Sequence, residues 1–317
     1  MLSLRRRGMG PPVTERGPPV VRSTAEKEEA MNTGSGRRGL AALLLAFGVP
    51  LWLGCTFVVE KQVRGSGHVT VETRSTINAT GVALMALGDL DIEISDREEL
   101  RIEAEDNLLS FIETEIVDGV LQIRQHESVV LEPSKSVRFH LAVPRLDHIL
   151  FTAGGHIRIP RMHTDRLTVQ HRGSGRLEMA GLNATSISIH GSGSGEVVLQ
   201  QVEVQQCRLI QSGSGNLQVR HLEGLSNDVR LTGSGDITIH RGSVVQQSAF
   251  VSGSGDLKAS GLRTSATEVM ASGSGSAAVH AGDRLDATVT GGGDIRYRGK
   301  PVVYQSISGS GEVIRIR

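Results

Sequence analysis

The sequence predicts an all-β protein, a right-handed parallel β-helix (solenoid) whose coils of about 20 residues stack on one another. Three observations predict this fold. The triplet Gly-Ser-Gly returns at a fixed interval, apolar residues alternate with polar ones after each triplet, and these apolar residues fall at the same place in successive coils, as Ile157, Leu177 and Val197 do. Crossovers between parallel strands are almost always right-handed, which sets the expected hand. The triplets of the unbroken series begin at Gly173, Gly193, Gly213, Gly233, Gly253 and Gly273.

Residues 153–317 form the regular part of the predicted solenoid. Ala153 occupies the place of the first triplet, and two shorter steps lead to Gly291 and Gly309. Each coil holds two alternating runs, the pattern of strands with one buried face. A single coil is too small to bury enough apolar surface to offset its conformational entropy, so the coils are expected to share one continuous core.

Each triplet is expected to form a corner of its coil. Glycines such as Gly173 and Gly175 permit a positive φ and a close approach of neighbouring backbones. The middle serine would form a ladder along the corner, hydrogen-bonded to local backbone or to the serine of the next coil. An anion-binding nest of glycine amides is the functional alternative, although a phosphate loop leads into a helix and carries a lysine, and these triplets do neither. The serines are Ser174, Ser194, Ser214, Ser234, Ser254, Ser274 and Ser310.

Residues 70–152 are expected to begin the solenoid with irregular β coils that cap its open end. The pair Asp118-Gly119 predicts a tight hairpin turn. At the opposite end, Arg315 and Arg317 are expected to blunt the last strand edge with charge. Strands are predicted at 65–71, 90–94, 100–104, 116–117, 120–123 and 137–143, and a short helical or irregular turn is predicted at 107–112.

Two segments are predicted to precede the mature protein. Residues 1–30 are expected to be disordered, or to be an upstream extension from a misassigned start with Met31 as the initiator. Residues 31–54 are predicted to be a signal peptide, because two arginines precede an apolar run that is too short to span a membrane comfortably.

The residues Leu-Trp-Leu-Gly-Cys that end at Cys55 resemble the bacterial lipobox, with Trp52 where leucine is usual. The resemblance implies that Cys55 becomes an acylated amino terminus, carrying palmitate-type chains that attach the protein to a membrane. Residues 55–69 would then be a linker. An ordinary cleaved signal and an uncleaved anchor are the alternatives. Because Thr56 stands where an Asp would favour retention in the inner membrane, an outer membrane lipoprotein of the cell envelope is expected, in a periplasmic or surface-facing orientation.

Composition excludes some functions. Lys plus Arg and Asp plus Glu are each 34, so the chain lacks the basic excess that nucleic-acid binding requires, and aromatic residues are only 3%. There are two cysteines, Cys55 and Cys207. If Cys55 is acylated, no disulfide can form, and Cys207 is expected to be a small buried apolar residue.

Three segments of the first half, followed by the Gly-Ser-Gly-Asp repeats, resemble the putative auto-transporter adhesin, head GIN domain family. They are 104–109 (AEDNLL), 112–115 (IETE) and 118–123 (DGVLQI), and the resemblance covers roughly residues 70–317. It implies a right-handed β-helix on an exported, often lipid-anchored, cell-envelope protein. The family is one of unknown function and carries no agreed catalytic residues, so none is transferred to this chain.

The residue after the triplet is often acidic, as at Asp236, Asp256 and Asp294. On adjacent coils two such carboxylates would lie about 5 Å apart, where they could hold Ca²⁺ or serve as acid and base in glycoside hydrolysis. The structural alternative is a corner residue that caps backbone amides. The eleven histidines scatter over different offsets, so no metal site is predicted. No catalytic residue and no cofactor are predicted either.

Together these patterns predict a non-enzymatic, lipid-anchored cell-envelope protein whose β-helix presents a binding, adhesion or scaffolding surface to a protein or a polysaccharide. One alternative is a β-helix polysaccharide-active enzyme, a hydrolase or lyase that uses Asp236 and Asp256. Another is a Ca²⁺-stabilised stalk. The oligomeric state is left open.

Overall fold

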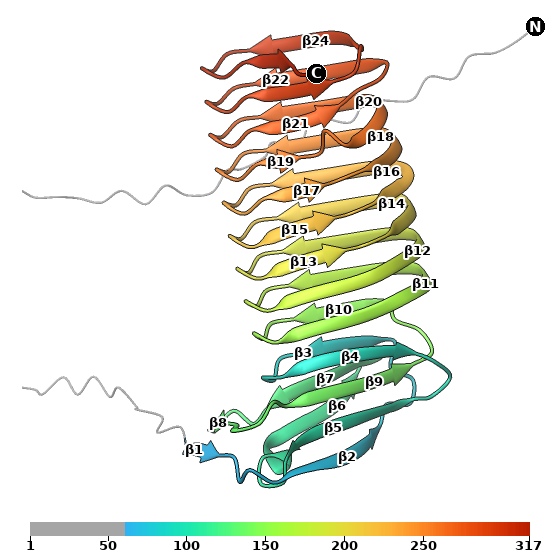
Figure 1. Cartoon of the computed structure of the whole chain (residues 1–317), viewed down its shortest axis with the longest axis vertical. Helices are drawn as coiled ribbons and strands as arrows, with labels where there is room; N and C mark the ends of the chain where they lie inside the picture. The colour runs from blue at the N-terminus through green and yellow to red at the C-terminus, as the bar shows by residue number, and fades with distance from the viewer. Residues whose placement is uncertain (1–60) are drawn as a thin grey trace, which may run out of the picture. The chain divides into compact units, whose positions relative to one another are not determined.

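A computed structural model describes residues 61–317, which lie within one compact unit, Phe57–Arg317. These residues form parallel strands stacked coil upon coil, as Figure 1 shows. The only helical element among them is a short 3₁₀ turn, Leu109–Phe111. No helix in this part of the chain is long and apolar enough to cross a membrane. The predicted export leader and Cys55 lie outside the described residues.

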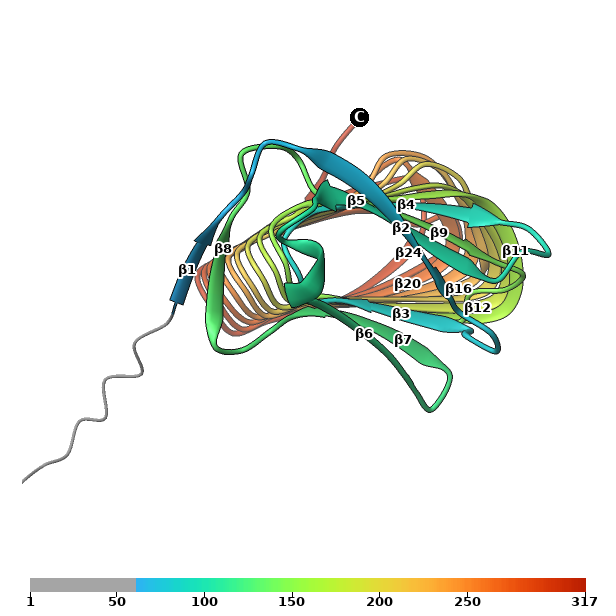
Figure 2. The same ribbon diagram turned by 90° about the horizontal axis from the view of Figure 1, so that it is seen from below.

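The stack has two faces on opposite sides of the coil, and the successive coils lie over one another when the stack is viewed along its axis (Figure 2). Face 1 runs in the spatial order β2 (Val69–Ser75), β5 (Glu99–Glu105), β9 (Arg138–Val143), β4 (Asp89–Ile94), β11 (His156–His171), β12 (Arg176–Gly191), β13 (Glu196–Leu199), β15 (Asn216–Val219), β17 (Ile237–Ile239), β19 (Leu257–Lys258), β21 (Ala277–His280), β23 (Ile295–Arg298) and β25 (Val313–Arg315). The long strands β11 and β12 bend and continue into face 2.

Face 2 runs in the spatial order β6 (Ile112–Val117), β7 (Val120–Gln125), β3 (Gly81–Leu84), β10 (His148–Phe151), the second halves of β11 and β12, β14 (Val202–Gln211), β16 (Leu222–Leu231), β18 (Gly242–Val251), β20 (Leu262–Ala271), β22 (Arg284–Val289) and β24 (Val302–Ile307). A separate parallel pair joins β1 (Lys61–Arg64) to β8 (Val129–Glu132). Strand β1 therefore lies in a segment for which the sequence predicted only a linker.

The pairing register confirms the predicted columns. Ile157 pairs with Leu177, and Leu177 pairs with Val197, so positions twenty apart are neighbours in space. The sequence spacing between paired residues then falls from twenty to eighteen. Leu257 still pairs with Ala277, but Ala266 pairs with Arg284. This coil is therefore two residues shorter than the one before it, and the shortening lies at the corner between β21 and β22. The strands on both sides of this corner keep their pairing register.

The core lies between the two faces and is continuous from coil to coil. In one column on face 2, Val169, Ile189 and Leu209 are completely buried. Most strands of the regular coils, such as β14 and β18, alternate buried and exposed residues, because successive side chains point to opposite sides of a sheet. The shared core that the sequence predicted is therefore confirmed.

Strands β2 to β9 form the irregular end of the stack, which we call the cap. The pairs β2–β5, β5–β9 and β6–β7 are antiparallel, unlike the coils that follow. The hairpin between β6 and β7 turns at Asp118 and Gly119, with φ values of 51° and 76°, as the Asp-Gly pair predicted. The predicted short turn at 107–112 contains the 3₁₀ turn.

The prediction that the corner glycines adopt a positive φ is wrong. None of the triplet glycines in the repeats from Gly173 onward has a positive φ; among the described residues that conformation occurs at five other glycines, one of them Gly67 in the cap. Close approach alone requires glycine at the corners. A Cβ on Gly213 would lie 2.1 Å from the carbonyl oxygen of Gly193, and one on Gly215 would lie 2.0 Å from that of Gly195. The stacking distance, not the corner conformation, therefore demands glycine.

Candidate functional site

The corner serines line the outside of the stack. Ser174 and Ser214 are exposed, as are the other middle serines of the triplets. One hydrogen bond joins two of them, from Ser274 Oγ to Ser254 Oγ at 3.4 Å. The corner is therefore a hydroxyl-rich stripe whose serines are largely open to solvent, and the stack depends on the flanking glycines more than on a serine hydrogen-bond ladder.

The acidic residues after the triplets form a ladder of hydrogen bonds. Asp236 Oδ1 accepts the backbone N–H of Asp256 at 2.9 Å, and Asp256 Oδ1 accepts that of Ser276 at 2.9 Å. Asp294 Oδ1 accepts the N–H of Glu312 at 3.1 Å. Each side chain thus caps a backbone amide of the next coil. This geometry matches the structural alternative stated for these positions, not a pair of free carboxylates.

Asp236 also binds Lys258, whose Nζ lies 2.5 Å from Asp236 Oδ2. Partial burial acts to raise the pKa of Asp236, but the hydrogen bonds from Lys258 and from the backbone of Asp256 outweigh it and lower this pKa. A general acid needs a raised pKa. Within residues 61–317, no group of three His, Cys, Asp or Glu side chains is arranged to hold a metal ion.

Face 2 carries two adjoining depressions of about 480 and 290 Å³, both lined by Ser226 and Asp228. Together they follow outward-facing positions of successive coils, from Arg166 at one end to Arg284 at the other. We call this feature the face-2 groove. Its central part is lined on one side by Gln206, Ser226 and Gln246 and on the other by Arg208, Asp228 and Ser248.

Charge in the face-2 groove is partly paired. Arg208 Nε lies 3.0 Å from Asp228 Oδ2. Arg284 hydrogen-bonds to Asp286, which lowers the pKa of Asp286, and its guanidinium lies 4.9 Å from the ring centroid of Tyr304. The groove therefore offers hydroxyl, amide, carboxylate and guanidinium groups at a repeat of about 4.8 Å, the spacing of neighbouring strands.

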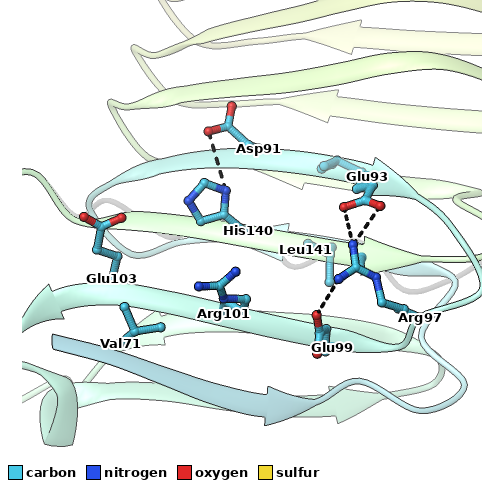
Figure 3. A pocket seen from close by; sticks show the side chains of 11 residues that line it. Val71, Asp91, Glu93, Arg97, Glu99, Arg101, Glu103, His140 and Leu141 are labelled. Carbon is cyan, nitrogen blue, oxygen red and sulfur yellow. Dashed lines mark hydrogen bonds and ion pairs between the residues drawn. The ribbon is translucent and has the colours of Figure 1, made fainter.

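A third depression, of about 290 Å³, lies on the outer surface of β4, β9 and β5 in the cap (Figure 3). Arg97 binds Glu93 at 2.7 Å and Glu99 at 3.2 Å across one side of it. His140 Nδ1 lies 3.9 Å from Asp91 Oδ2 on the other side. Ion pairs thus occupy most of the charged groups that line this depression.

The fold and its surface define a parallel β-solenoid with a polar groove along one face. The chain belongs to the family described as putative auto-transporter adhesin, head GIN domain, whose model matches residues 80–241 and 200–301. The resemblance seen in the sequence is confirmed. A search among curated proteins finds no match to this chain.

Solved structures share the fold. A putative adhesin from Parabacteroides distasonis ATCC 8503 is 26% identical, with a TM-score of 0.59, over 81% of this chain and 100% of its own. A putative adhesin from Parabacteroides merdae ATCC 43184 is 21% identical, with a TM-score of 0.60 and the same coverage. A putative lipid binding protein from Parabacteroides distasonis ATCC 8503 is 24% identical, with a TM-score of 0.58 and again the same coverage.

The structure separates the predicted site residues from the groove. Asp236, Asp256 and Asp294 lie at the corner, whereas the face-2 groove was not predicted from the sequence. A signal for it was present, because the outward position of the second run is polar in successive coils, as at Gln206, Ser226 and Gln246. The buried columns define the core, but they do not indicate which of the outward columns borders a groove.

Proposed function

We propose that this chain is a non-enzymatic, lipid-anchored protein of the cell envelope, and that its face-2 groove binds an extended polysaccharide. The observation that carries the proposal is the groove itself, which crosses successive coils and repeats polar side chains at the strand spacing. A periodic surface suits a periodic ligand. Serine, glutamine, aspartate and arginine side chains can donate to and accept from sugar hydroxyls.

The similarity to a putative adhesin at 26% identity supports an adhesion-like role. The family description points the same way. The hydrogen-bonded ladder at the corner supports a structural use of Asp236 and Asp256, and so weighs against the hydrolase or lyase alternative.

The groove is tested by binding of the full chain to a panel of neutral and acidic polysaccharides. A Gln206→Ala/Gln246→Ala variant should bind about thirtyfold more weakly, because the two lost hydrogen bonds together contribute about 2 kcal/mol. Ser214→Ala/Ser234→Ala is the matched control, since these serines are exposed on the corner instead. Equal loss in both variants, or no binding to any polysaccharide, would contradict the proposal.

Lipid anchoring rests on Cys55, which has a separate test. Growth with a fatty-acid analogue should label the wild-type protein and leave a Cys55→Ser variant unlabelled. Fractionation should place the wild-type protein in the outer membrane and release the variant. Label that persists in Cys55→Ser would remove the anchor from the proposal without affecting the groove.

One observation keeps an enzyme as the second candidate: the cap depression places carboxylates and His140 around a single hollow. Incubation with the same polysaccharides would reveal this activity as a falling chain length. Turnover abolished by Glu103→Gln would identify the cap, and turnover abolished by Asp236→Ala would identify the corner ladder. Either result would replace the binding role with catalysis.

A further inference from the structure

The two ends of the stack are built differently. Among the described residues, face 1 ends in β2 at the cap and in β25 at the other end, which we call the tip. Face 2 ends in β6 at the cap and in β24 at the tip. Each of these four strands pairs on one side only. Both ends therefore present backbone N–H and C=O groups that no strand in the described part of the chain satisfies.

The tip exposes the end of the apolar core. Val289 is fully buried, but Ile307, its partner in the next coil, is 45% exposed because no other coil among residues 61–317 covers it. Val302 and Tyr304 on the same strand pair with the outward-facing Arg284 and Asp286, so they lie on the outer side of the strand, where they are 61% and 56% exposed. The last strand therefore exposes apolar side chains at the core end and on its outer side, and we regard it as a contact surface, since apolar residues gathered at an unpaired edge are uncommon.

The rim of the tip is basic. Asp294 is paired with Arg296 at 2.9 Å. In segments 294–298 and 312–317, which form corners and strands of the last two coils, Glu312 is the only other acidic side chain. The remaining basic side chains have no ion-pair partner within residues 61–317. They are Arg298, Lys300, Arg315 and Arg317.

The outer edges of the cap are apolar and acidic. Val71 on β2 is 51% exposed, and Ile116 on β6 is 37% exposed. Glu115 on β6 and Asp118 at the hairpin turn are exposed beside them, and because Glu115 shares Arg124 with Glu113, the hairpin keeps a net negative charge. The cap edge thus complements the tip in charge, and both offer apolar side chains and unpaired strands.

We propose that the tip of one copy docks on the cap of a second copy, so that copies associate head to tail. Strand β2 is antiparallel to β5, and β5 is antiparallel to β9, so β2 runs in the same direction as β25. Strand β25 of one copy therefore pairs in parallel with β2 of the next copy and continues face 1. The apolar side chains of β24 and β6 pack beside this joint. The contact is heterologous and does not close on itself.

A tip-to-tip dimer is disfavoured because the two basic rims would repel each other. Arginines at an edge discourage pairing with a like edge but permit pairing with an acidic one. A membrane surface with anionic lipids also complements a basic, apolar tip. Lipid headgroups, however, do not supply the aligned row of donors and acceptors that two unpaired strand edges require. The proposal is independent of the polysaccharide groove.

Sedimentation velocity of the full chain in detergent tests the proposal. We expect the average sedimentation coefficient to rise with protein concentration and to fall when salt is added, because screening weakens the attraction between rim and cap. A tip variant, Ile307→Ser/Arg315→Gln, and a cap variant, Val71→Ser/Glu115→Gln, should each associate at least about tenfold more weakly. Circular dichroism and thermal unfolding check that both variants fold.

Mixing the two variants is the decisive step. The intact cap of the tip variant should bind the intact tip of the cap variant, so the mixture should form one-to-one dimers although each variant alone is monomeric. A parent chain that stays monomeric, or a tip variant that self-associates as the parent does, would overturn the proposal. A monomeric parent that binds phosphatidylglycerol vesicles and loses this binding in the tip variant would assign the tip to a lipid surface instead.

Discussion

Gly213 illustrates why single residues control this fold. A Cβ at this position would lie 2.1 Å from the carbonyl oxygen of Gly193, a backbone atom that cannot move aside without shifting a whole coil. We expect Gly213→Ala to lower the free energy of unfolding by about 1–3 kcal/mol, the usual cost of overpacking. Ser214→Ala is the control and should change it by less than about 0.5 kcal/mol, because Ser214 is exposed. Chemical denaturation measures both; equal effects would show that close approach is not the constraint.

Glu105 is a carboxylate buried in the cap, with 1% of its surface exposed. It accepts hydrogen bonds from the Ser134 hydroxyl at 2.6 Å, the Ser134 N–H at 2.8 Å and the Gly67 N–H at 2.6 Å. These bonds, led by that of the Ser134 side chain, lower the pKa of Glu105 below its ordinary value of 4.5. The carboxylate therefore holds two loops of the cap together in its ionised form.

The lowered pKa gives a pH dependence with a definite sign. The stabilisation by Glu105 is fully present above pH 4.5 and is lost as the pH falls through the folded-state pKa, because protonation then removes acceptor capacity. We expect Glu105→Gln to have a lower Tm than wild type at neutral pH and a smaller deficit in acid. Glu103→Gln, on the same strand, is the control. A deficit that is constant from neutral to acid pH would contradict this role.

The sequence pattern predicts the positions of some residues but not the contacts that their side chains make. The spacing predicted glycine corners and carboxylate neighbours twenty residues apart, and both are present. It offered amide capping by Asp236 only as the alternative to a carboxylate pair, and it could not tell that the capped N–H belongs to Asp256 on the next coil. Nor could it tell that the corner glycines have ordinary φ values. Both depend on how one corner sits above another, which is a property of two coils and not of one.

At the scale of the strands, one core column changes from apolar to polar residues and back along the stack. It is apolar at Ile187 and at Leu285, but Asn227 and Gln247 occupy it in the middle. Gln247 Nε2 donates to Asn227 Oδ1 at 3.1 Å, and Gln247 Oε1 has no partner. A buried polar pair of this kind is costly when it is broken and close to neutral when it is replaced as a unit.

This column leads to a double-variant test. Asn227→Leu should lower the free energy of unfolding by about 1–3 kcal/mol, because it leaves Gln247 Nε2 buried without an acceptor. Adding Gln247→Met should recover much of the loss, since it removes the orphaned amide while roughly conserving its volume. Urea denaturation of the two single variants and the double variant measures the coupling. A double variant that is less stable than both singles would contradict the argument.

The elements divide into those that the sequence could predict and those that it could not. The coils from β11 onward follow a fixed spacing, so a column such as Ile157, Leu177 and Val197 could be aligned without coordinates. The cap could be predicted only as separate strands and a hairpin. Its order, in which β5 lies between β2 and β9, depends on long-range antiparallel pairings that leave no period in the sequence. The depression in Figure 3 was missed for the same reason.

At the scale of the whole molecule, each coil contacts mainly the coil before it and the coil after it. Stability should therefore be close to a sum over coils and their interfaces. Cys207 is a useful reporter of that stack, because burial raises the pKa of its thiol to about 12 and keeps it unreactive. A thiol reagent should modify Cys207 only when the middle of the solenoid opens.

Removing one whole coil tests this view of the molecule. Deletion of 173–192 joins Arg172 to Gly193, so that Ile157 would pair with Val197 and every core column would stay in phase. We expect this variant to keep its β-sheet circular dichroism spectrum, a single cooperative unfolding transition and a protected Cys207. Its length by small-angle X-ray scattering should fall by about 4.8 Å, one strand spacing. Deletion of 173–182 is the matched control: it removes half a coil, places a corner against a strand and should abolish folding. A chain that tolerates the half-coil deletion, or that unfolds when the whole coil is removed, is not held together by stacked twenty-residue coils.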